Sequence, residues 1–207
     1  MKQITITTIF ILCAIFAMTT AAAAQATFVV DTTADNGALT ACTTAPNDCS
    51  LRGAITTANV TTAADTIEFD ATVFAGTQTI TMIGDHFRVQ GGPLTINGTG
   101  ANRLTINGGA PGTNRIFYIN TSLLTLQGMT LTGGNGTGDV SPQASAEGGA
   151  ILSLGSGRLA ANEINVTGNT STGQGGGIYL SNGGRIENST FSQNQASAPG
   201  GALVVLT

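Results

Sequence analysis

The amino-acid sequence predicts an all-β fold in which short strands stack as a solenoid, one unit upon the next. The main observation is a small-small-small-aliphatic motif that occurs three times and ends at Ile151, Ile178 and Leu203, at intervals of 27 and 25 residues. A repeat of fixed period indicates units that bury their apolar faces against their neighbours. With 29 glycines and only 9% charged residues, the composition favours strands and turns over amphipathic helices. The repeated positions are Gly149, Ile151, Gly176, Ile178, Gly201 and Leu203.

The N-terminus has the features of a secretory signal peptide. Lys2 precedes an apolar stretch from Ile4 to Met18, and the small-x-small sequence Ala24-Gln25-Ala26 follows. We therefore expect residues 1–26 to be removed on export. An uncleaved membrane anchor is the alternative, because the stretch that ends at Ala24 is barely long enough to span a bilayer. After residue 26 the chain has six arginines, no lysine and eleven acidic residues, so nucleic acid is not an expected partner.

Residues 27–62 are predicted to form a cap over the N-terminal end of the solenoid, whose apolar cross-section would otherwise be exposed. In an exported protein the pair Cys42 and Cys49 is expected to form a disulfide. A metal site is the weaker alternative, because two cysteines and one distant histidine make a poor ligand set. The next residues carry apolar side chains at the i, i+3, i+4 and i+7 positions of an amphipathic helix, namely Leu51, Ala54, Ile55 and Ala58.

This segment also carries a recognisable motif. Cys42 is followed after six residues by Cys49-Ser50-Leu51-Arg52-Gly53-Ala54-Ile55 and then by Ala58-Asn59. The motif resembles the CSLREA domain, which heads many exported bacterial right-handed parallel β-helix proteins. The later sequences Gly-Gly-Ala-Ile and Phe191-Ser192-Gln193-Asn194 resemble the repeats of polymorphic outer-membrane proteins. The resemblance implies a right-handed parallel β-helix over residues 63–207.

Gly53 departs from the family, which has glutamate at that position. A serine followed three residues later by glutamate forms a capping box that satisfies two backbone amides at a helix start. With Gly53, only the Ser50 hydroxyl can cap the helix. We expect the helix to be weakened by about 1 kcal/mol and to depend more on the disulfide.

From Thr66 onward, alternation of apolar and polar residues predicts strands. Three later units share a column of apolar positions, and Asn169 and Asn194 follow the last two at the same offset, which predicts an asparagine ladder. A leucine-rich repeat is the alternative fold, but the glycine-rich turns leave no room for a repeated helix. Residues 132–147 are expected to form a loop that projects from the stack. Because the sequence stops within a predicted strand, we expect the protein to continue beyond Thr207 into further coils or an anchor domain.

Few residues suggest catalysis, so no catalytic residue and no metal ligand is assigned. His86, the one histidine, is interpreted as a surface turn residue. No carboxylate recurs at the repeat interval, and the acidic residues Asp65, Glu68, Asp70 and Asp85 are interpreted as solvated strand ends and turns. Thr79-x-Thr81 and Thr130-x-Thr132 are expected not to repeat in register, so an ice-binding face is not predicted.

Arg158 and Arg185 are the candidate binding residues. Each lies seven residues after an aliphatic position of the repeat, Ile151 and Ile178, so we expect them to be neighbours in register with backbones about 5 Å apart. Two like charges this close either separate into water or share an anion, such as the carboxylate of an acidic sugar. Ion pairs with Glu163 or Glu187 are the simpler interpretation.

The sequence thus favours a non-catalytic scaffold for adhesion or carbohydrate contact, secreted or displayed on a bacterial outer-membrane surface. The expected partner is a polysaccharide or the surface of a host or neighbouring cell, with no membrane span in the mature part. No cofactor is expected; calcium would enter only with the first alternative, a polysaccharide lyase or glycoside hydrolase on the same scaffold. The second alternative is a structural spacer for a further C-terminal module.

Overall fold

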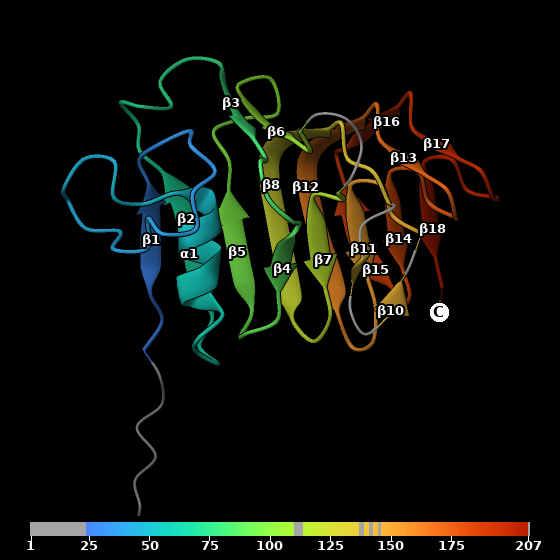
Figure 1. The fold of residues 1–207 in the computed structure, drawn as a ribbon, viewed down its shortest axis with the longest axis horizontal. Helices are drawn as coiled ribbons and strands as arrows, with labels where there is room; N and C mark the ends of the chain where they lie inside the picture. Colours follow the sequence, from blue (N-terminus) through green and yellow to red (C-terminus); the bar gives the residue numbers. More distant parts are fainter. Residues whose placement is uncertain (1–23, 110–113, 137–138, 141–142, 145, 207) are drawn as a thin grey trace, which may run out of the picture.

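The computed structural model describes residues 24–109, 114–136, 139–140, 143–144 and 146–206 (Figure 1). Within these ranges the chain is all-β apart from one helix, α1 (Leu51–Ala58), and a few turns. The predicted signal peptide lies almost wholly outside the described residues. Among the residues that are described, no helix is both long and apolar enough to cross a bilayer.

Parallel pairing dominates, and two sheets contain most of the strands. The larger sheet joins β1 (Thr27–Val30), β2 (Asp65–Phe69), β3 (Gln78–Thr81), β5 (Leu94–Asn97), β6 (Leu104–Asn107), β8 (Leu123–Thr132), β12 (Arg158–Thr167), β15 (Gly184–Glu187) and β16 (Thr190–Ser192). The second joins β4 (Phe87–Val89), β7 (Phe117–Ile119), β11 (Ile151–Ser153), β14 (Ile178–Leu180) and β18 (Leu203–Val205). Two short pairs complete the set: β13 (Thr170–Ser171) with β17 (Gln195–Ala196), and the antiparallel β9 (Asp139–Val140) with β10 (Gln143–Ala144).

The larger sheet has two parts, because its longest strands change partners halfway. The first half of β8 pairs with β5 and the second half with β6, and β12 pairs likewise with β15 and β16. Left-handed backbone at Gly128 and Glu163, with φ of 61° and 54°, separates the halves. We therefore describe three faces. The first face comprises β1, β2, β5, β15 and the first halves of β8 and β12; the second comprises β3, β6, β16 and the second halves; the third is the β4-β7-β11-β14-β18 sheet.

Inward side chains of all three faces meet in one hydrophobic core. They stack in rows, because each strand is in register with the next. On the third face Ile151 pairs with Ile178, and Ile178 pairs with Leu203, so the repeated aliphatic positions lie in one row. The glycines of the motif allow close backbone approach: a Cβ at Gly149 would lie 2.1 Å from the carbonyl oxygen of Gly176.

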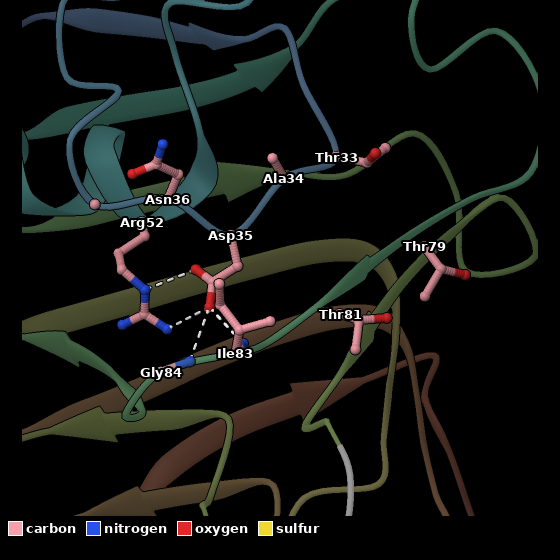
Figure 2. A pocket seen from close by; sticks show the side chains of 10 residues that line it. Thr33, Ala34, Asp35, Asn36, Arg52, Thr79, Thr81, Ile83 and Gly84 are labelled. Carbon is pink, nitrogen blue, oxygen red and sulfur yellow. Dashed lines mark hydrogen bonds and ion pairs between the residues drawn. The ribbon is translucent and has the colours of Figure 1, made fainter.

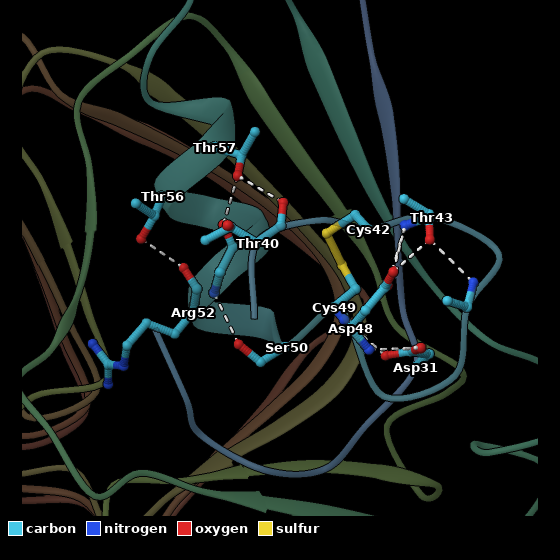
Figure 3. The surroundings of a disulfide bond; sticks show 12 residues. Asp31, Thr40, Cys42, Thr43, Asp48, Cys49, Ser50, Arg52, Thr56 and Thr57 are labelled. Carbon is cyan, nitrogen blue, oxygen red and sulfur yellow. Dashed lines mark hydrogen bonds between the residues drawn. A yellow bond between two sulfur atoms is a disulfide. The ribbon is translucent and has the colours of Figure 1, made fainter. Parts of the chain in front are cut away.

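The N-terminal segment packs on this stack in two ways. Its strand β1 extends the first face by pairing with β2, and α1 buries one apolar side in the common core. The predicted disulfide between Cys42 and Cys49 is confirmed, and it closes the loop that leads into α1 (Figure 3). Ser50 caps the helix by accepting a hydrogen bond from the Gly53 amide at 3.0 Å.

Gly53 has a packing role that the sequence does not reveal. A Cβ at this position would lie 1.8 Å from the carbonyl oxygen of Leu39, in the loop that crosses the helix. The same oxygen accepts a hydrogen bond from the Ser50 amide at 3.1 Å. The glycine therefore lets the loop touch the helix, and a larger side chain here would displace it.

The segment expected to project as a loop, residues 132–147, contains the β9–β10 pair. Its presence lengthens the interval between paired residues of β8 and β12: Thr130 pairs with Asn165, 35 residues later, whereas Asn165 pairs with Thr190 after 25. The register on either side of the insertion is unchanged, so the insertion does not interrupt the pairing of the strands.

Candidate functional site

The two candidate arginines lie on the outer side of the first face, but they are not register partners. Arg158 pairs with Leu123, and Arg185 pairs with Ala160. The expectation that they are neighbours in register is therefore wrong. The reason is the length of the connections between the third and first faces: Leu159 lies eight residues after Ile151, whereas its partner Gly184 lies only six after Ile178.

The two side chains nevertheless border one depression, which we call the arginine hollow. It has a volume of about 270 Å³ and is lined by Leu123, Arg158, Leu159, Ala160, Gly184 and Arg185. A smaller depression of about 120 Å³ adjoins it and adds Thr125, Asn162 and Glu187. Ala160 lies in register between Thr125 and Arg185, and its short side chain leaves the surface low at this point.

The charges of the hollow are only partly compensated. Arg185 forms an ion pair with Glu187 at 2.6 Å, as the simpler sequence interpretation predicted, but both side chains are well exposed, at 75% and 42%. Exposed pairs of this kind contribute little to stability and are readily exchanged for another anion. Within the described part of the chain, the Arg158 side chain has no ion pair or hydrogen bond, although its backbone amide donates to the Ser122 carbonyl at 2.9 Å. The hollow therefore presents a guanidinium group beside hydroxyl and amide groups, a combination that can bind a carboxylated or sulfated sugar.

A larger hollow, of about 790 Å³, lies between the N-terminal segment and β3 (Figure 2). Its charged residues are Asp35 and Arg52, joined by two bonds of 2.6 and 2.8 Å, and Asp35 also accepts the Ile83 amide at 2.9 Å. Burial raises the pKa of Asp35, but the bonds from Arg52 and the backbone outweigh it and hold this pKa below its usual value. The Arg52 guanidinium also lies 4.7 Å from the centre of the Phe87 ring. Both charges thus fasten the N-terminal segment to the stack.

His86 is buried, with 7% exposure, and not at the surface as the sequence interpretation had it. Its ring packs edge-on against Tyr118, with centroids 5.5 Å apart. Burial, reinforced by the positive charges of Arg115 and Arg88, lowers the pKa of His86 to about 4. An imidazole with that pKa is neutral at physiological pH and a weak general base.

The acidic residues near β2 are engaged one by one in local contacts. Asp65 is buried and accepts hydrogen bonds from the Ala26 amide at 2.8 Å and from the Thr61 hydroxyl. Glu68 accepts a hydrogen bond from the Asn97 side chain at 2.7 Å. Asp70 accepts hydrogen bonds from two backbone amides of its own turn. Among the described residues, no three His, Cys, Asp or Glu side chains are placed to hold a metal ion. Asp70 and Asp31 line one depression of about 470 Å³, but both carboxylates are engaged with backbone amides, Asp31 with those of Asp48 and Cys49.

Asn169 and Asn194 form hydrogen bonds along the stack. The Asn169 side-chain amide donates to the Asn194 side-chain oxygen at 3.0 Å and to the carbonyls of Leu131 and Thr167 at 3.1 Å. Its own oxygen accepts the Gly134 amide at 2.8 Å. Left-handed backbone occurs one residue before each of these asparagines, at Gly168 and Gln193.

No protein-family model, curated protein or solved structure matches this chain.

Proposed function

We propose that this protein is a non-catalytic, right-handed parallel β-helix that is secreted or displayed on a cell surface, where it contacts acidic carbohydrate through the arginine hollow. The fold part of the proposal is supported by three parallel faces, entered in turn by the chain, around a single core. The resemblance of the Cys42–Asn59 segment to the CSLREA domain supports the same fold and an exported location, and the Cys42–Cys49 disulfide suits such a location.

The observation that carries the binding proposal is the position of Arg158. Its guanidinium lies on an open, solvent-facing surface with no protein partner among the described residues, next to an arginine whose only ion pair is exposed. The other candidate groups are used differently: Arg52 and Asp35 hold the N-terminal segment, and His86 is buried. This distribution favours recognition over a lyase or hydrolase reaction.

A glycan-array measurement with the disulfide-bonded protein tests the proposal. We expect binding to glycans that carry carboxylates or sulfates, and a decrease of binding with increasing salt, because the attraction is between exposed charges. The double variant R158A/R185A should lower the affinity by about tenfold, which corresponds to the loss of one or two charge-assisted hydrogen bonds.

Arg88 offers a matched control. It is half-buried on the third face, 5.0 Å from the centre of the Tyr118 ring, and R88Q removes one positive charge from a different surface, as the single variant R158A does from the hollow. R88Q should bind acidic glycans as the unaltered protein does. Equal weakening by R88Q and by R158A alone would show that only net charge matters. Release of unsaturated uronides by the protein would replace the proposal with the lyase alternative.

A further inference from the structure

The outer side of the second face carries two columns of small polar side chains. The first column runs Thr79, Thr105, Thr130, Asn165, Thr190 along five strands that are paired in register. The second runs Thr81, Asn107, Thr132, Thr167, Ser192 along the same five strands. We call these ten residues the threonine array.

The sequence expectation that Thr79-x-Thr81 and Thr130-x-Thr132 do not repeat in register is therefore wrong. The two pairs are connected through Thr105 and Asn107 on the intervening strand β6. Successive members of a column lie 26, 25, 35 and 25 residues apart, and the long interval is the one that contains β9 and β10. The insertion interrupts the period in the sequence only after Thr132, and the register continues across it.

The array is uncharged and regular in two directions. Parallel strands lie about 4.8 Å apart, and alternate residues along a strand are about 6.6 Å apart, so the hydroxyl and amide groups form a two-dimensional lattice. Both intervals are close to repeat distances between oxygen atoms in hexagonal ice. All ten residues are partly or well exposed. Thr79 and Thr81, on the edge strand β3, also line the larger hollow that contains Asp35 and Arg52 (Figure 2).

Most groups of the array are available to water; Asn107 is an exception, because its side-chain oxygen accepts the Gly109 amide at 3.0 Å. For Thr79, Thr81, Thr105 and Thr190, no hydrogen bond from the side chain to another described residue occurs. Ser192 donates to Thr167 at 2.8 Å, within the array itself, and the Thr130 hydroxyl donates to the Ala101 carbonyl. Threonine adds a methyl group beside each hydroxyl, so the lattice alternates hydrogen-bonding and apolar groups.

The fold holds the lattice rigid. The inward residues between the columns are Ile80, Ile106, Leu131, Val166 and Phe191, of which the first four are fully buried. At β8, β12 and β16, residues with left-handed backbone lie before and after the segment that contributes to the array. These pairs are Gly128 and Gly133, Glu163 and Gly168, and Asn188 and Gln193. The asparagine ladder binds the carbonyls of Leu131, Val166 and Thr167. The side chains therefore stand on a backbone with little freedom to rearrange.

From this geometry we propose that the threonine array binds ice. A rigid lattice of hydroxyl and methyl groups at these intervals can order a layer of water that continues into the crystal. A regular array binds most favourably to a crystalline solid, because such a surface can contact many equivalent positions at once. A crystalline polysaccharide is the other regular surface. The array has no aromatic side chain on which sugar rings stack, and no charge. This site is separate from the arginine hollow, so the proposal does not depend on the carbohydrate proposal.

Partition into a slowly growing ice hemisphere, together with microscopy of crystal shape, tests the proposal with the full chain. The unaltered protein should be enriched in the ice and should shape the crystals. T132Y places a ring in the middle of the array and holds the surface away from the crystal, so enrichment should fall by about tenfold or more. T105Y does the same one strand away and serves if T132Y lowers the folded fraction measured by circular dichroism.

T95Y is the matched control, because Thr95 is a half-buried, outward threonine in β5 on the first face. This variant should enter ice as the unaltered protein does. Exclusion of the unaltered protein from ice, full enrichment of both T132Y and T105Y, or equal loss in T95Y would each overturn the proposal. So would sedimentation of the protein with crystalline chitin or cellulose, abolished by T132Y, without any enrichment in ice.

Discussion

Asn169 is the residue whose removal tests most directly how the stack is held together. Its side chain is fully buried, and it satisfies three backbone groups, the carbonyls of Leu131 and Thr167 and the amide of Gly134. Asn169→Ala would leave these groups without their side-chain partner in a site that water does not reach. An orphaned buried group costs about 1–3 kcal/mol. Because the two carbonyls keep part of their hydrogen bonding in the strands, we expect a total loss of about 3–5 kcal/mol.

Such a loss is a large fraction of the 5–15 kcal/mol by which domains are typically stable. Urea denaturation followed by circular dichroism measures it as a lower midpoint with an unchanged slope. Asn194→Ala is the comparison from the same ladder, since Asn194 is only partly buried and serves two backbone groups, the Val166 carbonyl and the Asn169 amide. It should cost about 1–2 kcal/mol. A loss below 1 kcal/mol for Asn169→Ala, or equal losses for both variants, would refute the view that this ladder closes the backbone hydrogen bonding.

Two further predictions concern other buried positions. Because the pKa of His86 is about 4 when folded and about 6.5 when unfolded, the unfolded state binds more protons between these values, and stability should fall by about 2–3 kcal/mol from pH 7 to pH 4.5. Denaturation curves of His86→Gln should lack this decrease, and an unchanged pH dependence would contradict the assignment. Gly53→Ala should destabilise by about 1–3 kcal/mol, because its Cβ meets Leu39, although helix propensity alone predicts a gain of about 1 kcal/mol. Gly76→Ala, with no atom within 4 Å of the new Cβ, should be neutral in thermal unfolding.

The stacked rows of the core could be predicted from the sequence, because each inward side chain must match the inward side chains of the neighbouring strands. Ile151, Ile178 and Leu203 were found by spacing alone, and they form one row of the core. The disulfide and the helix followed from short-range patterns, in which a few residues constrain each other directly. The pairing of Asn169 with Asn194 could also be predicted, because the turn that contains each asparagine has the same length in both units.

Outward positions were harder to predict, because nothing in the core fixes the length of the connections between faces. Arg158 and Arg185 share an offset in the sequence, but the connections before them differ by two residues, so the offset does not translate into pairing. The threonine array was missed because Asn107 takes the place of threonine on the intervening strand β6, and because the insertion between β8 and β11 interrupts the period beyond Thr132. The burial of His86 and the contact at Gly53 depend on Tyr118 and Leu39, which are distant in sequence and leave no local signal.

The β9–β10 insertion has a consequence for how such a protein can change over evolutionary time. Thr130 and Thr132 keep their partners Asn165 and Thr167 across it, as though the extra residues were not there. Lengthening a surface connection costs only about 0.6 kcal/mol per doubling of its length. This corner is therefore a place where new segments can be grafted and diversified while the scaffold remains constant, which makes it a natural point for engineering a displayed peptide.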